Sequence, residues 1–192
     1  MENNNKKMNQ IVETAKRLFT DYGYKRVTMD EIAKGSGVVK NTIYQYFKDK
    51  DDLLKYFITQ EISKMKDIVE EIENTSKTTF EMLHNTIYEL LIYRKNQKFL
   101  ITIAKEAKSL QTNSTCESIK MIDESIINYI EEKIKLGIKK NVVRNCNTKV
   151  TAFALFEVYV ALAFKWEEEN EPLNEQEISE NLSIFLKTGL II

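Results

Sequence analysis

The chain has 192 residues, of which 43% are apolar and 30% are charged, as is usual for a water-soluble protein with a sizeable core. One Pro and five Gly are few for a sheet-rich chain with many tight turns, so the composition favours helices. The first ten residues have no apolar stretch behind their charges, and the apolar run 152–164 is too short to cross a bilayer. We therefore expect a cytoplasmic protein without a membrane segment.

The sequence offers little for metal, redox or catalytic chemistry. Cys116 and Cys146 have no Cys or His close by, and His84 is the only histidine, so we expect no disulfide framework and no metal site. There is also no Gly-rich phosphate loop, no nucleophile elbow and no paired carboxylate set. These patterns argue against an enzyme, and no cofactor is expected.

The net charge of −1 conceals an uneven distribution. Residues 1–60 carry 11 Lys and Arg against 8 Asp and Glu, a net of +3, which leaves −4 for residues 61–192. The first part therefore favours a nucleic-acid partner, and the second does not.

A first amphipathic helix is indicated by apolar residues at helical spacing, namely Ile11, Ala15, Leu18 and Phe19. Gly23 in "DYGYKR" suits a left-handed cap that ends it. Thr28 and Glu31 then have the spacing of a capping box, in which the Thr hydroxyl and the Glu carboxylate each satisfy an amide at a helix start. A second helix is therefore expected from Thr28 to about Lys34.

A third, short helix follows the break at Gly35-Ser36-Gly37 and is expected from about Val39 to Tyr44 or Gln45. Asp49 is a good N-cap for a fourth helix, with acidic residues in its first turn. Beyond residue 78 the apolar spacing is again helical, over 80–95, 98–110, 118–140, 148–169 and a last helix capped by Asn174. The expected fold is all-α, with three amino-terminal helices followed by a larger helical part.

The two short helices joined by a Gly-rich turn have the form of a helix-turn-helix. Lys40 and Asn41 open the third helix, where Lys can donate to guanine and Asn can pair with adenine. Thr28, Tyr46 and Lys50 are placed to bond phosphate oxygens, which sets the register of docking. The predicted DNA contacts are Thr28, Lys40, Asn41, Thr42, Tyr44, Tyr46 and Lys50. The residues expected to face inward are Ile32, Ala33, Val38, Ile43 and Phe47.

Residues 11–54 resemble the amino-terminal domain of the tetracycline-repressor (TetR) family of bacterial transcription regulators. The resemblance rests on A-x-x-L-F, G-Y, T-x-x-x-I-A, G-V, T-I-Y-x-Y-F and K-x-x-L-L, in the family's order and spacing. It covers about a quarter of the chain. It implies that the third helix enters the major groove, that Thr28, Tyr46 and Lys50 touch the DNA backbone, and that a homodimer binds a palindromic operator.

Two positions depart from the family's pattern. Val39 stands where the family has Ser or Thr, which removes a hydroxyl that would cap the third helix and contact a phosphate. Asn41 stands where Gly or Ala is common, which adds reach, so base readout is expected to depend on it. Tyr44 lies at a position that either packs inward or touches a phosphate.

The resemblance also implies a DNA-binding domain over 1–52 and a ligand-sensing and dimerisation domain over 53–192, with the last two long helices in the dimer interface. The sequence independently indicates that this helix is covered on every side, within its own domain or by another chain, because 150–164 is apolar nearly all round. The expected interface residues are Phe156, Val160, Phe164, Ile178, Leu182, Phe185 and Leu186.

A small apolar or cationic ligand is expected in the second domain. The candidate pocket residues are His84, Tyr88, Phe99, Met121, Tyr129, Phe153 and Glu157, although aromatics at helical spacing are also typical of a core. Glu157 is a lone carboxylate on an apolar helix, so it needs a cationic ligand, a Lys or Arg elsewhere, or the dimer seam. Glu106, between Lys105 and Lys108, is expected on a solvated face.

Two functions fit these observations. The first is a repressor that releases operator DNA when a small molecule binds. The alternative is a DNA-binding protein of the same kind whose second domain binds a protein partner. A lined cavity in the second domain would favour the first.

Overall fold

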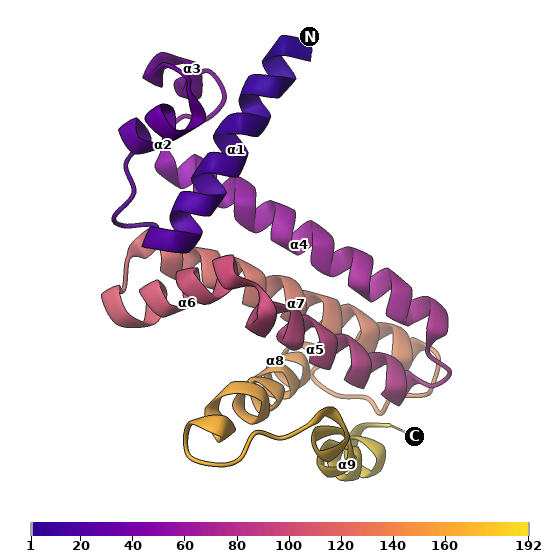
Figure 1. The fold of residues 1–192 in the computed structure, drawn as a ribbon. Coiled ribbons are helices and arrows are strands. Elements are labelled where there is room, and N and C mark those ends of the chain that lie inside the picture. The colour runs from indigo at the N-terminus through magenta and orange to yellow at the C-terminus, as the bar shows by residue number, and fades with distance from the viewer. Residues whose placement is uncertain (1, 192) are drawn as a thin grey trace. The chain divides into compact units, whose positions relative to one another are not determined.

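The computed structural model describes residues 2–191, apart from the side chains of 2–5, 187 and 188. Within this range every regular element is a helix (Figure 1), which confirms the all-α prediction. The elements are α1 (Glu2–Tyr22), α2 (Met29–Ser36), α3 (Lys40–Tyr44), α4 (Lys50–Thr75), α5 (Thr79–Asn96), α6 (Lys98–Leu110), α7 (Asn113–Lys139), α8 (Thr148–Val160), η1 (Ala161–Lys165), η2 (Trp166–Glu168), α9 (Glu175–Phe185) and η3 (Leu186–Leu190).

The helices form two compact units. The first comprises residues 1–63 and 95–122, and the second comprises 64–94 and 123–192. The boundaries fall inside α4, α5 and α7, so each of these helices contributes to both units, although only the last two residues of α5 belong to the first. The division at residue 52 stays a prediction. Across residues 2–191 no helix is both long enough and apolar enough to cross a membrane.

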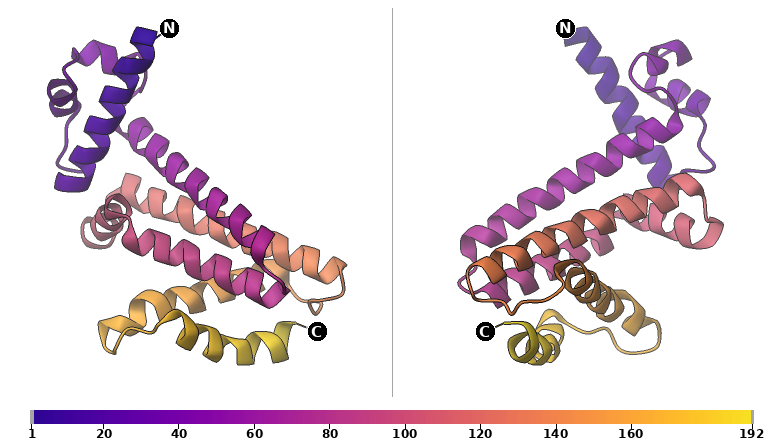
Figure 2. Two further views of the ribbon diagram at one scale, coloured as in Figure 1. Left: turned by 45° about the vertical axis from the view of Figure 1, so that its right-hand side comes forward. Right: turned by 180° about the vertical axis from the view of Figure 1, so that it is seen from behind.

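The core of the first unit is built on aromatic side chains. The ring of Phe57 on α4 meets Phe19 of α1 at 6.0 Å and Phe99 of α6 at 5.8 Å, both edge to face. Helix α2 packs beside α1, and α3 packs against α2 (Figure 2). Lys16 of α1 adds an ion pair of 2.6 Å to the buried Glu61 of α4.

Glu106 corrects an expectation, because it is buried and does not lie on a solvated face. Its carboxylate accepts the backbone N–H of Lys25, at 3.0 and 3.2 Å to its two oxygens. Gly23, at φ 84°, lies so close that an added Cβ would approach Glu106 Oε2 to 2.9 Å. Helical spacing carried the signal: Glu106 falls on the same stripe as the buried Phe99 and Ile103.

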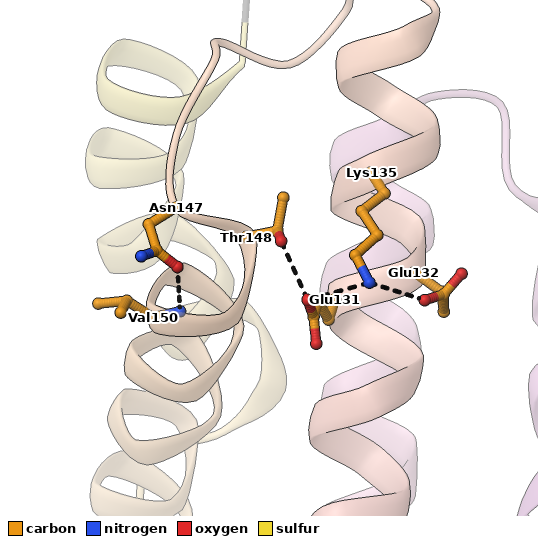
Figure 3. Close-up of polar contacts among 6 residues, drawn as sticks. All are labelled: Glu131, Glu132, Lys135, Asn147, Thr148 and Val150. Atoms are coloured by element: carbon orange, nitrogen blue, oxygen red, sulfur yellow. Dashed lines mark hydrogen bonds and ion pairs between the residues drawn. The ribbon is translucent and has the colours of Figure 1, made fainter.

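The second unit buries the predicted stripes of α5 and α7. Its buried apolar residues on these two helices are Leu83, Ile87, Leu90, Leu91, Ile126, Ile130 and Ile134. The start of α8 is fastened to α7 by Thr148, whose hydroxyl donates to Glu131 Oε1 at 3.0 Å (Figure 3). The α-helix of α8 ends at Val160 and continues as the π-turn η1 and the 3-10 turn η2, whereas one helix to residue 169 was expected.

The Glu106 contact predicts a stability effect. Replacing Glu106 with Ala removes the acceptor of a partly buried amide, which costs about 1–3 kcal/mol, so thermal unfolding is expected at a lower temperature. Glu117→Ala, an exposed carboxylate of the same unit, is the matched control and is expected to unfold like the parent. Equal midpoints for all three proteins would contradict a stabilising role of Glu106.

Candidate nucleic-acid interface

The start of α2 has the capping box that the sequence predicts. Thr28 Oγ1 accepts the N–H of Glu31 at 3.3 Å, and Glu31 Oε2 accepts the N–H of Thr28 at 2.8 Å and its hydroxyl at 2.9 Å. These bonds, the one from the backbone amide first, lower the pKa of Glu31. The hydroxyl of Thr28 is therefore oriented by its own helix at the position where a phosphate contact is expected.

The turn before α3 also follows the sequence. Gly37 is left-handed at φ 68° and ends α2, and Val39 precedes α3 in an extended conformation without a side-chain cap hydrogen bond. The loss of a capping hydroxyl at Val39 is therefore confirmed. Its side chain is 71% exposed.

The short helix α3 has a buried and an exposed side. Ile43 and Phe47 are buried, together with Ile32 and Ala33 of α2, and Val38 is half-buried. On the other side Asn41 and Tyr44 are exposed, while Thr42 and Tyr46 are half-buried. The inward set is thus placed as predicted, and Tyr44 does not pack into the core.

The side chain of Lys40, which was expected to face DNA, also contacts an acidic residue of its own chain. Its Nζ forms an ion pair of 2.8 Å with Asp30 Oδ1 of α2. The hydrogen bond to Asp30 is the main cause that raises the pKa of Lys40. The ammonium expected to reach guanine is therefore partly neutralised within the chain.

Lys50 is also engaged within its own unit. Its Nζ donates to the backbone carbonyls of Tyr24 at 2.9 Å and Val27 at 2.8 Å, and it lies 4.3 Å from the centre of the Tyr24 ring. Burial lowers the pKa of Lys50. The ammonium expected to bond a phosphate thus holds the loop that leads into α2.

Asp51 joins the same loop to α7. Its Oδ1 accepts the hydroxyl of Ser114 at 2.5 Å and the hydroxyl of Tyr24. These two bonds, that from Ser114 first, lower the pKa of Asp51. The acidic residues in the first turn of α4 were expected only to favour the start of that helix, and the long-range partners of Asp51 could not be inferred from local spacing.

The seven candidate pocket residues are divided between the two units. Phe99 and Met121 belong to the first unit, where Met121 borders an acidic cleft of about 340 Å³ formed with Asp51, Asp52 and Glu117. The other five candidates lie in the second unit.

Within the second unit, His84 is buried and its Nδ1 lies 2.8 Å from the hydroxyl of Tyr159. Burial lowers the pKa of His84. Its ring stacks between Phe80 and Tyr88, at 5.8 and 6.0 Å. Its Nε2 is a buried nitrogen without a hydrogen-bond partner among the described residues.

Three other pocket candidates of the second unit, Tyr129, Phe153 and Glu157, have surroundings that differ from those of His84. The hydroxyl of Tyr129 donates to Glu73 at 2.8 Å. Phe153 is 54% exposed. Glu157 is half-exposed and lies 3.9 Å from Lys165. A basic residue is therefore near Glu157, which was one of its three expected partners.

The expected dimer residues divide by exposure. Phe156, Ile178, Leu182 and Leu186 are buried within their own chain, Val160 and Phe164 are half-buried, and Phe185 is 70% exposed. The four buried residues face the core of the protomer, and their place in a dimer interface stays a prediction. The exposed apolar residues of α8 and α9 are instead Val150, Phe153, Val158, Ile184 and Phe185.

Residues 11–57 match the family model described as "Bacterial regulatory proteins, tetR family". The HTH-type transcriptional regulator YhgD of Bacillus subtilis (strain 168) is 35% identical over 180 residues, 94% of each chain. A solved TetR-family regulator of Syntrophomonas wolfei has a TM-score of 0.74 at 22% identity, covering 96% of this chain and 95% of its own.

Another solved transcriptional regulator, from Saccharomonospora viridis and in complex with choline, has a TM-score of 0.62 at 18% identity. It covers 96% of this chain and 97% of its own. At these identities the two solved structures show the same fold.

The Lys40–Asp30 pair predicts that Asp30→Asn strengthens DNA binding. The change releases the ammonium for a phosphate or a guanine, so the slope of log K against log salt should steepen by about 0.9 per protomer. Titration of DNA at several salt concentrations measures this slope. Asp67→Asn, an exposed carboxylate of the second unit, should leave it unchanged, and an equal effect of both variants would refute a specific role for Asp30.

The Lys50 contacts predict a loss of stability without a loss of salt dependence. Lys50→Ala leaves the carbonyls of Tyr24 and Val27 without this donor, which costs about 1–3 kcal/mol, so the unfolding temperature should fall. If Lys50 instead contacted a phosphate, the salt slope would decrease by about 0.9 per protomer. Lys48→Ala, at an exposed position nearby, serves as the control for stability.

Proposed function

The chain belongs to the TetR family of bacterial regulatory proteins, and we propose that it acts as a homodimeric repressor that binds a palindromic operator and leaves it when a small molecule binds. Membership of the family makes it a DNA-binding transcriptional regulator and not an enzyme. The proposal places it in the cytoplasm with the DNA that it regulates. The outer face of α3 is the observation that carries the DNA-binding part.

In this proposal α3 enters the major groove with its exposed side. Asn41 can pair bidentately with an adenine, and Tyr44 lies on the same exposed side of the helix. Thr28, at the start of α2, and Tyr46, just after α3, contact the backbone and set the register. The buried Ile43 and Phe47 fix the helix from behind.

Dimerisation is supported by the exposed apolar residues of α8 and α9. Val150 points away from α7 in Figure 3 and is exposed. Phe153 and Val158 follow along α8, and Ile184 and Phe185 add apolar area on α9. Several large exposed apolar side chains on a regulator are typical of an interface. A two-fold dimer would present two copies of α3 to half-sites about 34–36 Å apart.

The ligand proposal is supported by the polar groups inside the second unit. The orphaned Nε2 of the buried His84 can bond a polar group of a small molecule. Glu157 can accept a cation, because it is half-exposed and its ion pair with Lys165 is long at 3.9 Å. A protein of the same fold holds choline, which supports a small cation as one class to test.

The alternative is a DNA-binding protein of the same family whose second domain binds a protein partner instead of a small molecule. Exposed apolar residues such as Phe153 also suit a protein partner. Release of operator DNA by a small molecule separates the two readings, because only the first requires such a ligand.

Footprinting on the DNA that flanks the protein's own gene tests both docking and dimerisation. The parent is expected to protect two half-sites symmetrically. Phe185→Glu places a charge in the proposed interface and should give a monomer by light scattering, with operator affinity lower by about a hundredfold because bivalence is lost.

Leu136→Glu, at another exposed apolar position of the second unit, is the matched control and should remain a dimer. A parent that is monomeric in solution, or a Phe185→Glu variant that stays dimeric, would contradict the proposed interface. Adding choline or apolar compounds to the footprint then tests release, and a domain that responds only to a captured protein would support the alternative.

A further inference from the structure

Val39 has the most exposed of the large apolar side chains in the described part of the chain, at 71%. A single exposed apolar residue on a protein surface normally needs no explanation. The position of Val39 is informative, because it is the N-cap residue of α3. Its backbone is extended, so its side chain lies at the amino-terminal end of that helix.

The neighbouring side chains leave this edge with little positive charge. The Nζ of Lys40, the next residue, is held by Asp30 at 2.8 Å. Asn41 follows and is exposed. The groups that α3 presents at its start are therefore an isopropyl group and a carboxamide, which suit neither of the guanine acceptors O6 and N7 as well as a lysine would.

Thymine is the only base that displays a methyl group in the major groove, and apolar side chains contact that methyl. We propose that Val39 reads the 5-methyl group of one thymine in each half-site. The proposal rests on the docking of α3 under the proposed function. With Asn41 directed to adenine, it predicts A·T pairs at neighbouring positions of the half-site.

The experiment begins by selecting bound sequences from random double-stranded DNA with the full-length protein. The best duplex is then remade with deoxyuridine in place of each thymine in turn, which removes the methyl group and leaves the base-pairing edge unchanged. The parent is expected to bind about fourfold more weakly when one particular thymine of each half-site is replaced, the value of about one buried methyl group.

Val39→Ala should bind the thymine and the deoxyuridine duplex equally at that position, because its side chain is too short to reach the methyl. Asn41→Ala is the control: it should lose preference for an adenine but keep the fourfold methyl effect. Thermal unfolding checks that both variants fold like the parent, as expected for exposed positions.

Two outcomes would overturn the inference: no deoxyuridine substitution weakens binding by the parent, or the same substitution weakens Val39→Ala as much as the parent. In either case the enriched sequence shows that α3 still docks on DNA. Failure to enrich any sequence would instead reject the docking on which the inference rests.

Discussion

The loop between α1 and α2 depends on two charged side chains that come from elsewhere in the first unit. Its carbonyls at Tyr24 and Val27 accept from Lys50, and its amide at Lys25 donates to Glu106. Buried backbone groups need such partners, and hydrogen bonds to ionised groups are the stronger kind. Because Lys50 lies on α4 and Glu106 on α6, the position of α2 and α3 is fixed by helices outside the helix-turn-helix.

This arrangement gives the proposed repressor a physical route for its signal. Helix α4 carries Lys50 and Asp51 at its start and contributes its later residues to the second unit. Asp51 also holds Ser114 at the start of α7, a helix that both units share as well. A ligand that displaces either helix by its differential affinity would therefore strain the bonds that hold the loop. No separate linker is needed, since the helical backbone itself is continuous.

Local sequence signals predicted the helix boundaries of the DNA-binding part. They failed for residues such as Glu106, whose burial depends on contacts with residues far away in the sequence. Thr28 with Glu31, Gly37 and Asp49 gave the helix boundaries of the DNA-binding part, because a cap is satisfied by residues three or four positions away. Glu106 and Lys25 are 81 positions apart, and no spacing rule links them. The flanking lysines suggested a solvated Glu106, whereas the stripe with Phe99 and Ile103 placed it inside.

The limits of local signals also explain why the sequence did not predict which residues of α8 are buried and which are exposed. Its sequence is apolar on nearly every side, so helical periodicity does not distinguish the side that meets the protomer core from the side left outside. Phe156 proved to be inside and Phe153 outside, three positions apart. On α9, where polar residues alternate with the stripe, Ile178 and Leu182 are inside as an ordinary amphipathic helix requires, whereas Phe185, the last residue of α9, is exposed although its spacing places it on the same stripe.

The net charge of +3 on residues 1–60 overstates the charge that is available to DNA. Lys16 pairs with Glu61, Lys40 pairs with Asp30, and Lys50 serves two backbone carbonyls. Nonspecific attraction rises with the number of phosphates that basic side chains neutralise, so these three contacts weaken it. In the proposed homodimer, discrimination between sequences then rests more on the uncharged groups of α3 and on the use of two half-sites. Such a dimer would gain its operator preference from contact chemistry and geometry, because each protomer adds one copy of both.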